Sequence, residues 1–144
     1  MKKHIEGEKH SIAELMEIIE ELRDPKTGCA WDAEQTLQSY KKCLYDEAGE
    51  VFEAVDKDDA DNLCEELGDV LMILLSFAQL SKEKGRFDFN DVIDGVTDKL
   101  IRRHPHVFGD YKRPETAEES LELWKMVKKQ EKERKEKKNQ EKKK

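Results

Sequence analysis

The sequence predicts an all-α protein: an oligomeric helical bundle built around an antiparallel hairpin of two acidic helices. One pattern recurs nineteen positions along the chain, as Asp-Glu-Ala-Gly-Glu-Val from Asp46 and as Glu-Glu-Leu-Gly-Asp-Val from Glu65. Apolar residues in both copies follow the spacing of a helix with one buried face, and no segment alternates like a strand. The apolar positions are 44, 48, 51, 52 and 55 in the first copy and 63, 67, 70, 71 and 74 in the second.

Length and composition favour one domain that associates with copies of itself. A chain of 144 residues can bury one core. We expect a domain over residues 1–128, followed by a charged, disordered tail over residues 129–144. Hydrophobic residues make up only 36% of the chain and charged residues 42%. Because apolar residues are so few, we expect burial to be completed in a homo-oligomer, either a dimer or a tetramer.

The charge is divided unevenly along the chain. Residues 125–144 contain eleven Lys or Arg and four Glu, whereas the first 124 residues contain 16 basic and 30 acidic residues. An acidic body argues against nucleic-acid binding. The basic tail has no aromatic side chains between its charges, so we expect at most weak, salt-sensitive attraction to nucleic acid and no specific binding.

The cysteines and the apolar segments indicate the compartment. Cys29, Cys43 and Cys64 are odd in number and form no C-x-x-C motif, so we expect neither disulfides nor a zinc site and assign the protein to the reducing cytoplasm. No segment reaches the roughly 18 apolar residues of a membrane span, and residues 1–10 lack the apolar core of a secretory signal. We therefore expect no membrane association.

The first predicted helix begins at a capping box. Ser11 and Glu14 form this box, and apolar residues continue at helical spacing to Leu22, after which a proline and a glycine end the helix. Residues 29–36 show no period and are expected to form an ordered loop. The loop carries Trp31, either as a plug in the core or as a surface on which a base stacks.

The acidic hairpin follows, with helices expected over about 39–57 and 60–82 joined by a short link. The second helix is apolar nearly all round from Leu71 to Leu80, which predicts that it is the most buried helix. Gly49 and Gly68 occupy equivalent positions in the two copies. Because a glycine within a helix costs about 1 kcal/mol relative to alanine, we expect them to permit a close approach.

A fourth helix is expected over about 90–103. Lys99 and Arg103 lie one turn apart on it, either as solvated surface or as phosphate ligands. Pro105 ends the helix between two histidines, which we interpret as a turn rather than a metal site. The side chains expected to point inward are Val92, Ile93, Val96, Leu100 and Ile101.

The last helix begins at a second capping box, formed by Thr116 and Glu119. Trp124 and Lys128 lie one turn apart on it. From about Lys129 onward only charged and amide residues remain, so nothing there can be buried and the tail is expected to fray.

Four carboxylates recur at the same offset from the apolar pattern. Glu47 and Glu50 lie about 60° apart on one helix, and Glu66 and Asp69 take the equivalent positions on the other. Packed together, such charges repel one another unless a hard divalent cation neutralises them, and oxygen ligands favour Mg²⁺ or Mn²⁺ over zinc. The alternatives are an ordinary solvated surface, or a non-catalytic helical interaction module whose acidic face binds a basic partner.

Five motifs follow one another between about residues 10 and 130. They are Cys29-Ala-Trp-Asp32 with Glu34-Gln-Thr36, Asp46-Glu47-x-x-Glu50, Glu66-x-x-Asp69, Gly85-Arg-Phe87 and Lys99-Leu-Ile-Arg-Arg-His-Pro-His-Val-Phe108. In this order the motifs resemble the MazG family of nucleoside triphosphate pyrophosphohydrolases. The chain departs from the family at Ala30, where proline is usual, at Asp46, where glutamate is usual, and at Gly49, where an aromatic residue is frequent. Ala30 and Gly49 leave the nucleobase preference open.

The resemblance implies an all-α dimer or tighter assembly that uses Mg²⁺ to hydrolyse nucleoside triphosphates to monophosphate and pyrophosphate, with housecleaning of the nucleotide pool as the expected role. By position it implies a metal-ligand set of Glu47, Glu50, Glu66 and Asp69, in which Glu47 or Glu50 also activates the attacking water. It further implies substrate contacts by Lys99, Arg103, Trp124 and Lys128, to which we add Trp31 as a candidate.

Overall fold

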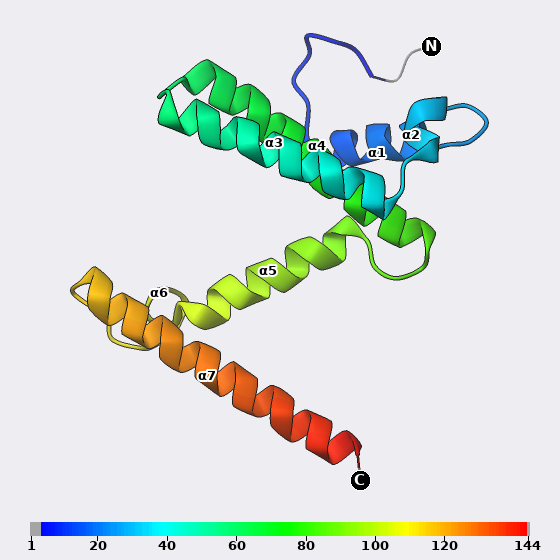
Figure 1. The fold of residues 1–144 in the computed structure, drawn as a ribbon. Helices are drawn as coiled ribbons and strands as arrows, with labels where there is room; N and C mark the ends of the chain where they lie inside the picture. The colour runs from blue at the N-terminus through cyan, green and yellow to red at the C-terminus, as the bar shows by residue number, and fades with distance from the viewer. Residues whose placement is uncertain (1–3, 144) are drawn as a thin grey trace. The chain divides into compact units, whose positions relative to one another are not determined.

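The computed structural model describes residues 4–143, and every regular element within them is a helix (Figure 1). The predicted all-α class is therefore confirmed. The chain divides into two compact units, one up to Phe89 and one from Asn90. The helices are α1 (Ile12–Leu22), α2 (Ala30–Glu34), α3 (Leu37–Asp56), α4 (Ala60–Glu83), α5 (Phe89–Arg103), α6 (Pro105–Phe108) and α7 (Ala117–Lys142).

In the first unit, α3 and α4 form the expected antiparallel hairpin, and α1 packs against α4 (Figure 1). The hairpin turn contains Asp58 with a φ of 52°, a left-handed conformation that aspartate tolerates better than most residues. Asp59 then caps α4 by accepting a hydrogen bond from the backbone N–H of Asn62 at 3.1 Å. Residues 29–36, expected to be a loop, include the short helix α2.

The core of the first unit lies between the hairpin helices. Tyr40 packs edge to face on Phe77, with ring centroids 6.3 Å apart, and clusters with Ile73 and Leu80. Helix α4 contains six buried residues, whereas no other helix within the described residues contains more than two. The prediction that this helix is the most buried is confirmed.

Burial follows the apolar pattern of the hairpin only in part. Phe52, Val55, Leu67 and Leu74 belong to the predicted buried faces but are exposed, Phe52 by 66%. Positions 44, 48 and 51 of α3 and 63, 70 and 71 of α4 are covered as predicted, and the covered side also includes 40, 47 and 54 of α3 and 62, 66, 69, 73 and 76 of α4. Three of the four predicted metal ligands therefore lie on the covered side of the hairpin rather than beside it.

The two repeated glycines do not mark a close approach. Gly49 and Gly68 are exposed, and a Cβ added at either position would meet no atom within 4 Å. The expected reason for these glycines is therefore wrong for the described chain.

The second unit leaves the apolar face of α5 uncovered. The side chains that were expected to point inward are Val92, Ile93, Val96, Leu100 and Ile101. They are between 36% and 51% exposed, so that prediction is wrong for the single chain. Within residues 4–143, no helix has both the length and the apolar character needed to cross a membrane.

Helix α5 ends at the predicted turn. Pro105 begins α6, where its fixed φ and missing N–H fit the first helical position, and His104 Nδ1 donates to the carbonyl of Leu100 at 2.7 Å. Thr116 caps α7 as predicted, accepting from the N–H of Glu119 at 3.1 Å.

The C-terminal segment differs from its prediction. Instead of fraying near residue 129, α7 continues as a helix to Lys142. The segment is rich in Lys, Glu and Gln, which are good helix formers, and it places glutamates four residues before lysines, as in Glu131 and Lys135. Such a helix needs no buried face. The proposed domain end at residue 128 stays a prediction.

Candidate active site

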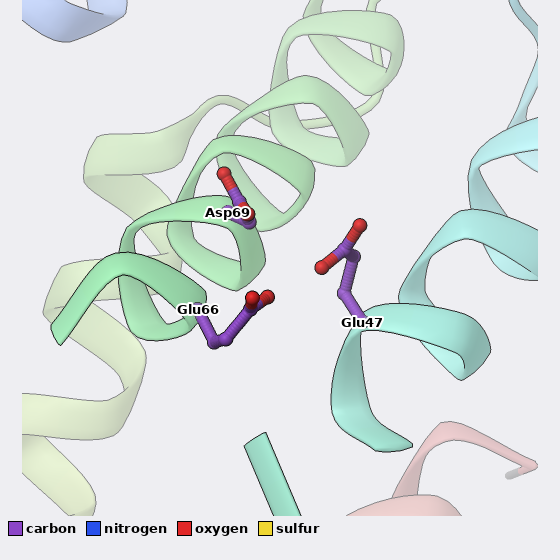
Figure 2. A group of neighbouring side chains, drawn as sticks. All are labelled: Glu47, Glu66 and Asp69. Carbon is purple, nitrogen blue, oxygen red and sulfur yellow. The ribbon is translucent and has the colours of Figure 1, made fainter. Parts of the chain in front are cut away.

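Three carboxylates converge between the hairpin helices. Glu47 projects from α3 towards Glu66 and Asp69 of α4 (Figure 2). One carboxylate oxygen of each residue lies within 4.8 Å of those of the other two, and all three side chains are half-buried. Glu47 lies on the covered side of α3, and Glu66 and Asp69 lie on the covered side of α4. Packing of the two helices therefore brings the three carboxylates together. We call these three residues the carboxylate cluster.

Glu66 is the residue most perturbed by this arrangement. Burial, hydrogen bonding with the Glu47 side chain and the negative charges of Glu47, Asp69 and Glu50 together raise the pKa of Glu66 to about 7. Its Oε2 atom is buried and has no hydrogen-bond partner within the described chain. A buried oxygen without a donor is costly, and a bound cation would satisfy it. The cluster therefore fits an oxygen-liganded divalent metal ion.

Glu50, the fourth predicted ligand, lies outside the carboxylate cluster. It is exposed on α3, and its charge is one of the causes that raise the pKa of Glu66. The structure thus brings together three of the four predicted ligands and leaves Glu50 close enough to act on them electrostatically.

An apolar pocket of about 280 Å³ adjoins the carboxylate cluster, because Glu47 contributes to both. Trp31 lines the pocket and is 59% exposed, so it is not a core plug. Tyr40, which the sequence did not single out as a site residue, lines it as well. In the sequence, Tyr40 could have been linked to the site only by its position two turns before Glu47 on the same helix. The other lining residues are Leu15, Ile18, Ile19, Leu22, Arg23, Asp32, Cys43, Met72, Ile73 and Ser76.

Arg23 fixes the segment that carries Trp31. Its guanidinium donates to the backbone carbonyls of Asp32 at 2.6 Å and Gln35 at 3.2 Å. It also donates to both carboxylate oxygens of Glu83, at 2.7 and 3.0 Å. These bonds tie α2 to the ends of α1 and α4. No sequence motif marks this residue, because its partners lie up to 60 positions away.

The second unit contains a cleft of about 500 Å³ between α5 and α7, which we call the basic cleft. Lys99, Arg103 and Lys128 all line it, so three predicted substrate contacts share one cavity. Trp124 lies beside them: the Lys128 ammonium is 4.3 Å from its ring centroid and the Arg103 guanidinium carbon 5.5 Å. The remaining lining residues are Arg102, Glu131, Lys132, Arg134, Lys135 and Lys138.

Comparisons with known proteins show the family to which the chain is related. The model of the MazG nucleotide pyrophosphohydrolase domain matches residues 35–108. A nucleoside triphosphate pyrophosphohydrolase of Escherichia coli is 43% identical over 122 residues, which cover 85% of this chain and 46% of that protein. The nucleoside triphosphate pyrophosphohydrolase/pyrophosphatase MazG of Thermotoga maritima is 46% identical over 119 residues, covering 83% of this chain and 44% of that protein.

One solved structure is similar over nearly its whole length. The crystal structure of a mazG-related protein from Thermotoga maritima has a TM-score of 0.67 and 34% sequence identity, covering 81% of this chain and 98% of that one. In contrast, the chain spans about half the length of the curated relatives that it matches.

Proposed function

Because the chain belongs to the MazG nucleotide pyrophosphohydrolase family, we propose that it hydrolyses nucleoside triphosphates to monophosphate and pyrophosphate with Mg²⁺, as part of nucleotide-pool housecleaning. The observation that carries this proposal is the carboxylate cluster, with its unpartnered Glu66 oxygen, beside an apolar pocket. The names of the relatives from Escherichia coli and Thermotoga maritima support the reaction.

Glu47, Glu66 and Asp69 would hold the metal ion, and we keep Glu50 in the proposed ligand set. Carboxylate oxygens without nitrogen or sulfur suit Mg²⁺, or Mn²⁺ in its place. When bound, such an ion polarises phosphate oxygens and lowers the pKa of a coordinated water. The carboxylates give the site a negative electrostatic potential in the absence of a metal ion, and this potential would favour binding of a cation.

We assign proton removal from the attacking water to Glu50, in preference to Glu47. Glu50 is exposed and lies outside the carboxylate cluster, so its oxygens are the ones least committed to the ligand set. A carboxylate with free lone pairs can accept the proton of a water molecule that it also orients. Glu47 belongs to the cluster and also lines the pocket, so it would hold the metal ion at the edge of the nucleoside site.

The apolar pocket would accept the nucleoside. Trp31 offers an exposed aromatic face against which a planar base can stack, Tyr40 forms part of the buried wall of the pocket, and the aliphatic lining excludes water. From the family resemblance we also propose that Lys99, Arg103 and Lys128 of the second unit bind phosphate groups, with arginine able to hold two oxygens at once. Trp124 would keep the two cations beside it in position.

We also propose that the active protein is a homo-oligomer. The five apolar side chains along α5 stay exposed in the single chain, and an exposed apolar face of this kind is typical of a subunit interface. A second copy of the chain would cover this face. Light scattering at micromolar concentration tests the proposal, and a monomeric mass would contradict it.

The reaction is tested by incubating the full chain with Mg²⁺, Mn²⁺ or EDTA and a panel of common, deoxy and damaged nucleoside triphosphates, and measuring the pyrophosphate released. Glu66→Gln should abolish release, whereas Glu65→Gln, an exposed neighbour with the same loss of charge, should not. A chain that binds no Mg²⁺ and releases no pyrophosphate would contradict the proposal and favour the helical interaction module instead.

A further inference from the structure

One acidic side chain lies among the cations of the basic cleft. Glu131 of α7 accepts a hydrogen bond from Arg102 Nε at 2.6 Å and two from Arg103, at 3.2 Å from Nη2 and 3.4 Å from Nε. The side chains of Glu131 and Arg103 are only 17% and 18% exposed. The carboxylate is therefore held between two guanidinium groups and largely shielded from water.

The other eight residues that line the cleft are all lysine or arginine. Lys128, Lys132 and Lys135 follow one another at helical spacing along one side of α7, opposite Arg102 and Arg103 of α5. Like charges gathered in one cavity repel one another, and a single carboxylate cannot neutralise them all. The cleft thus has a large surplus of positive charge and fits a ligand with several negative charges.

The carboxylate of Glu131 has the features of a phosphate group in such a site. A guanidinium donates two parallel hydrogen bonds to carboxylate and phosphate oxygens alike. Glu131 occupies the Nε and Nη2 donors of Arg103, which form one edge at which a guanidinium can hold a phosphate with two hydrogen bonds. The two anions must therefore compete for the same donors.

Given the phosphate contacts already proposed for Lys99, Arg103 and Lys128 in this cleft, we propose that Glu131 is a built-in competitor that holds the place of one phosphate group until a polyphosphate anion displaces it. Arg102, which the sequence did not single out, then becomes a further phosphate ligand. The identification of the anion with the triphosphate of the substrate, or with the pyrophosphate product, rests on the proposed function. The competition itself rests only on the contacts of Glu131.

A purely structural role for Glu131 predicts the opposite effect of its removal. If Glu131 serves only to tie α5 to α7, its loss should loosen the cleft and weaken anion binding. If Glu131 competes with the anion, its loss should strengthen binding. The direction of the change in affinity therefore separates the two roles.

The experiment measures binding of inorganic triphosphate and of pyrophosphate to the full chain by calorimetry, in EDTA and at fixed ionic strength. EDTA removes the metal-dependent contribution of the carboxylate cluster, and an inorganic probe makes the result independent of whether the chain hydrolyses nucleotides. Glu131→Gln should bind both probes roughly tenfold more tightly, the change expected when one charge-assisted contact no longer competes. Arg102→Gln should bind them more weakly.

Glu133→Gln is the matched control, because Glu133 is exposed on the same helix, does not line the cleft and loses the same charge. Its affinity should stay within about twofold of wild type, as for a screened surface charge. Equal tightening in both glutamine variants, or unchanged or weaker binding in Glu131→Gln, overturns the proposal. If circular dichroism shows that Glu131→Gln is unfolded, Glu131→Asp replaces it: the shorter side chain keeps the charge but should still bind the probes more tightly.

Discussion

Replacing Arg23 with methionine should destabilise the first unit by about 3 kcal/mol. The Arg23 side chain is 7% exposed and donates to two backbone carbonyls and to Glu83. Each lost hydrogen bond to a backbone carbonyl should cost about 1 kcal/mol. The pair with Glu83 should contribute only about 1 kcal/mol more, because that carboxylate is 38% exposed and screened by solvent. Methionine keeps most of the apolar contact of the arginine stem.

The variant should also bind nucleotide less well. Without Arg23 the segment carrying Trp31 is no longer tied to α4, so KM should rise while kcat changes little, because the carboxylate cluster keeps its own contacts. Urea unfolding measures the stability and steady-state release of pyrophosphate measures KM. Arg86→Met, at an exposed arginine just beyond α4, is the control. A stability loss below about 0.5 kcal/mol in Arg23→Met would refute the reasoning, since that is the range of ordinary surface substitutions.

The remaining predictions concern the carboxylate cluster, the phosphate contacts and one exposed glycine. The pKa of Glu66 in the folded chain is about 7, above its ordinary value of 4.5. Between pH 4.5 and pH 7 the metal-free folded chain therefore binds more protons than the unfolded chain. Its free energy of unfolding should fall as the pH rises through this range. Glu66→Gln should abolish metal-dependent hydrolysis and remove this loss, which urea unfolding in EDTA at pH 5 and pH 8 can detect; an unchanged pH dependence would contradict it. Lys99→Ala and Arg103→Ala should each lower kcat/KM by roughly tenfold or more, since each removes a proposed charge-assisted hydrogen bond to phosphate. Wild-type kinetics in the double variant would show that the phosphates are held elsewhere, such as at Lys128. Gly49→Ala should raise the free energy of unfolding by about 1 kcal/mol, because a Cβ there meets nothing within 4 Å; a loss of stability would mean that this face of α3 is covered in the assembled protein.

The helices and their starting points could be predicted from the sequence because each start depends on a few neighbouring residues. Ser11 and Thr116 each accept a hydrogen bond from an N–H three positions later, so a local pattern is enough to locate them. The repeated acidic pattern likewise indicated that carboxylates from two adjacent helices would meet. Motif order alone also indicated the family.

The composition of the site depended on which face of each helix is covered, and this is a property of the packed hairpin. Glu47, Glu66 and Asp69 came together while Glu50 stayed outside, although Glu50 has the same spacing from the apolar residues of α3 as Asp69 has from those of α4. A hydrophobic pattern assumes that apolar residues define the buried face, but a buried face that also carries carboxylates does not follow that rule.

Tertiary structure alone identified Arg23 and Glu131 as important residues. In sequence each is one charge among many, since 42% of the residues are charged. Their partners lie up to 60 positions away for Arg23 and 28 or 29 positions away for Glu131. What the sequence determined was therefore the set of helices, because capping and helix propensity act over a few residues. Which charges meet was decided only when the helices packed, because an ion pair depends on distance in space and not on spacing along the chain.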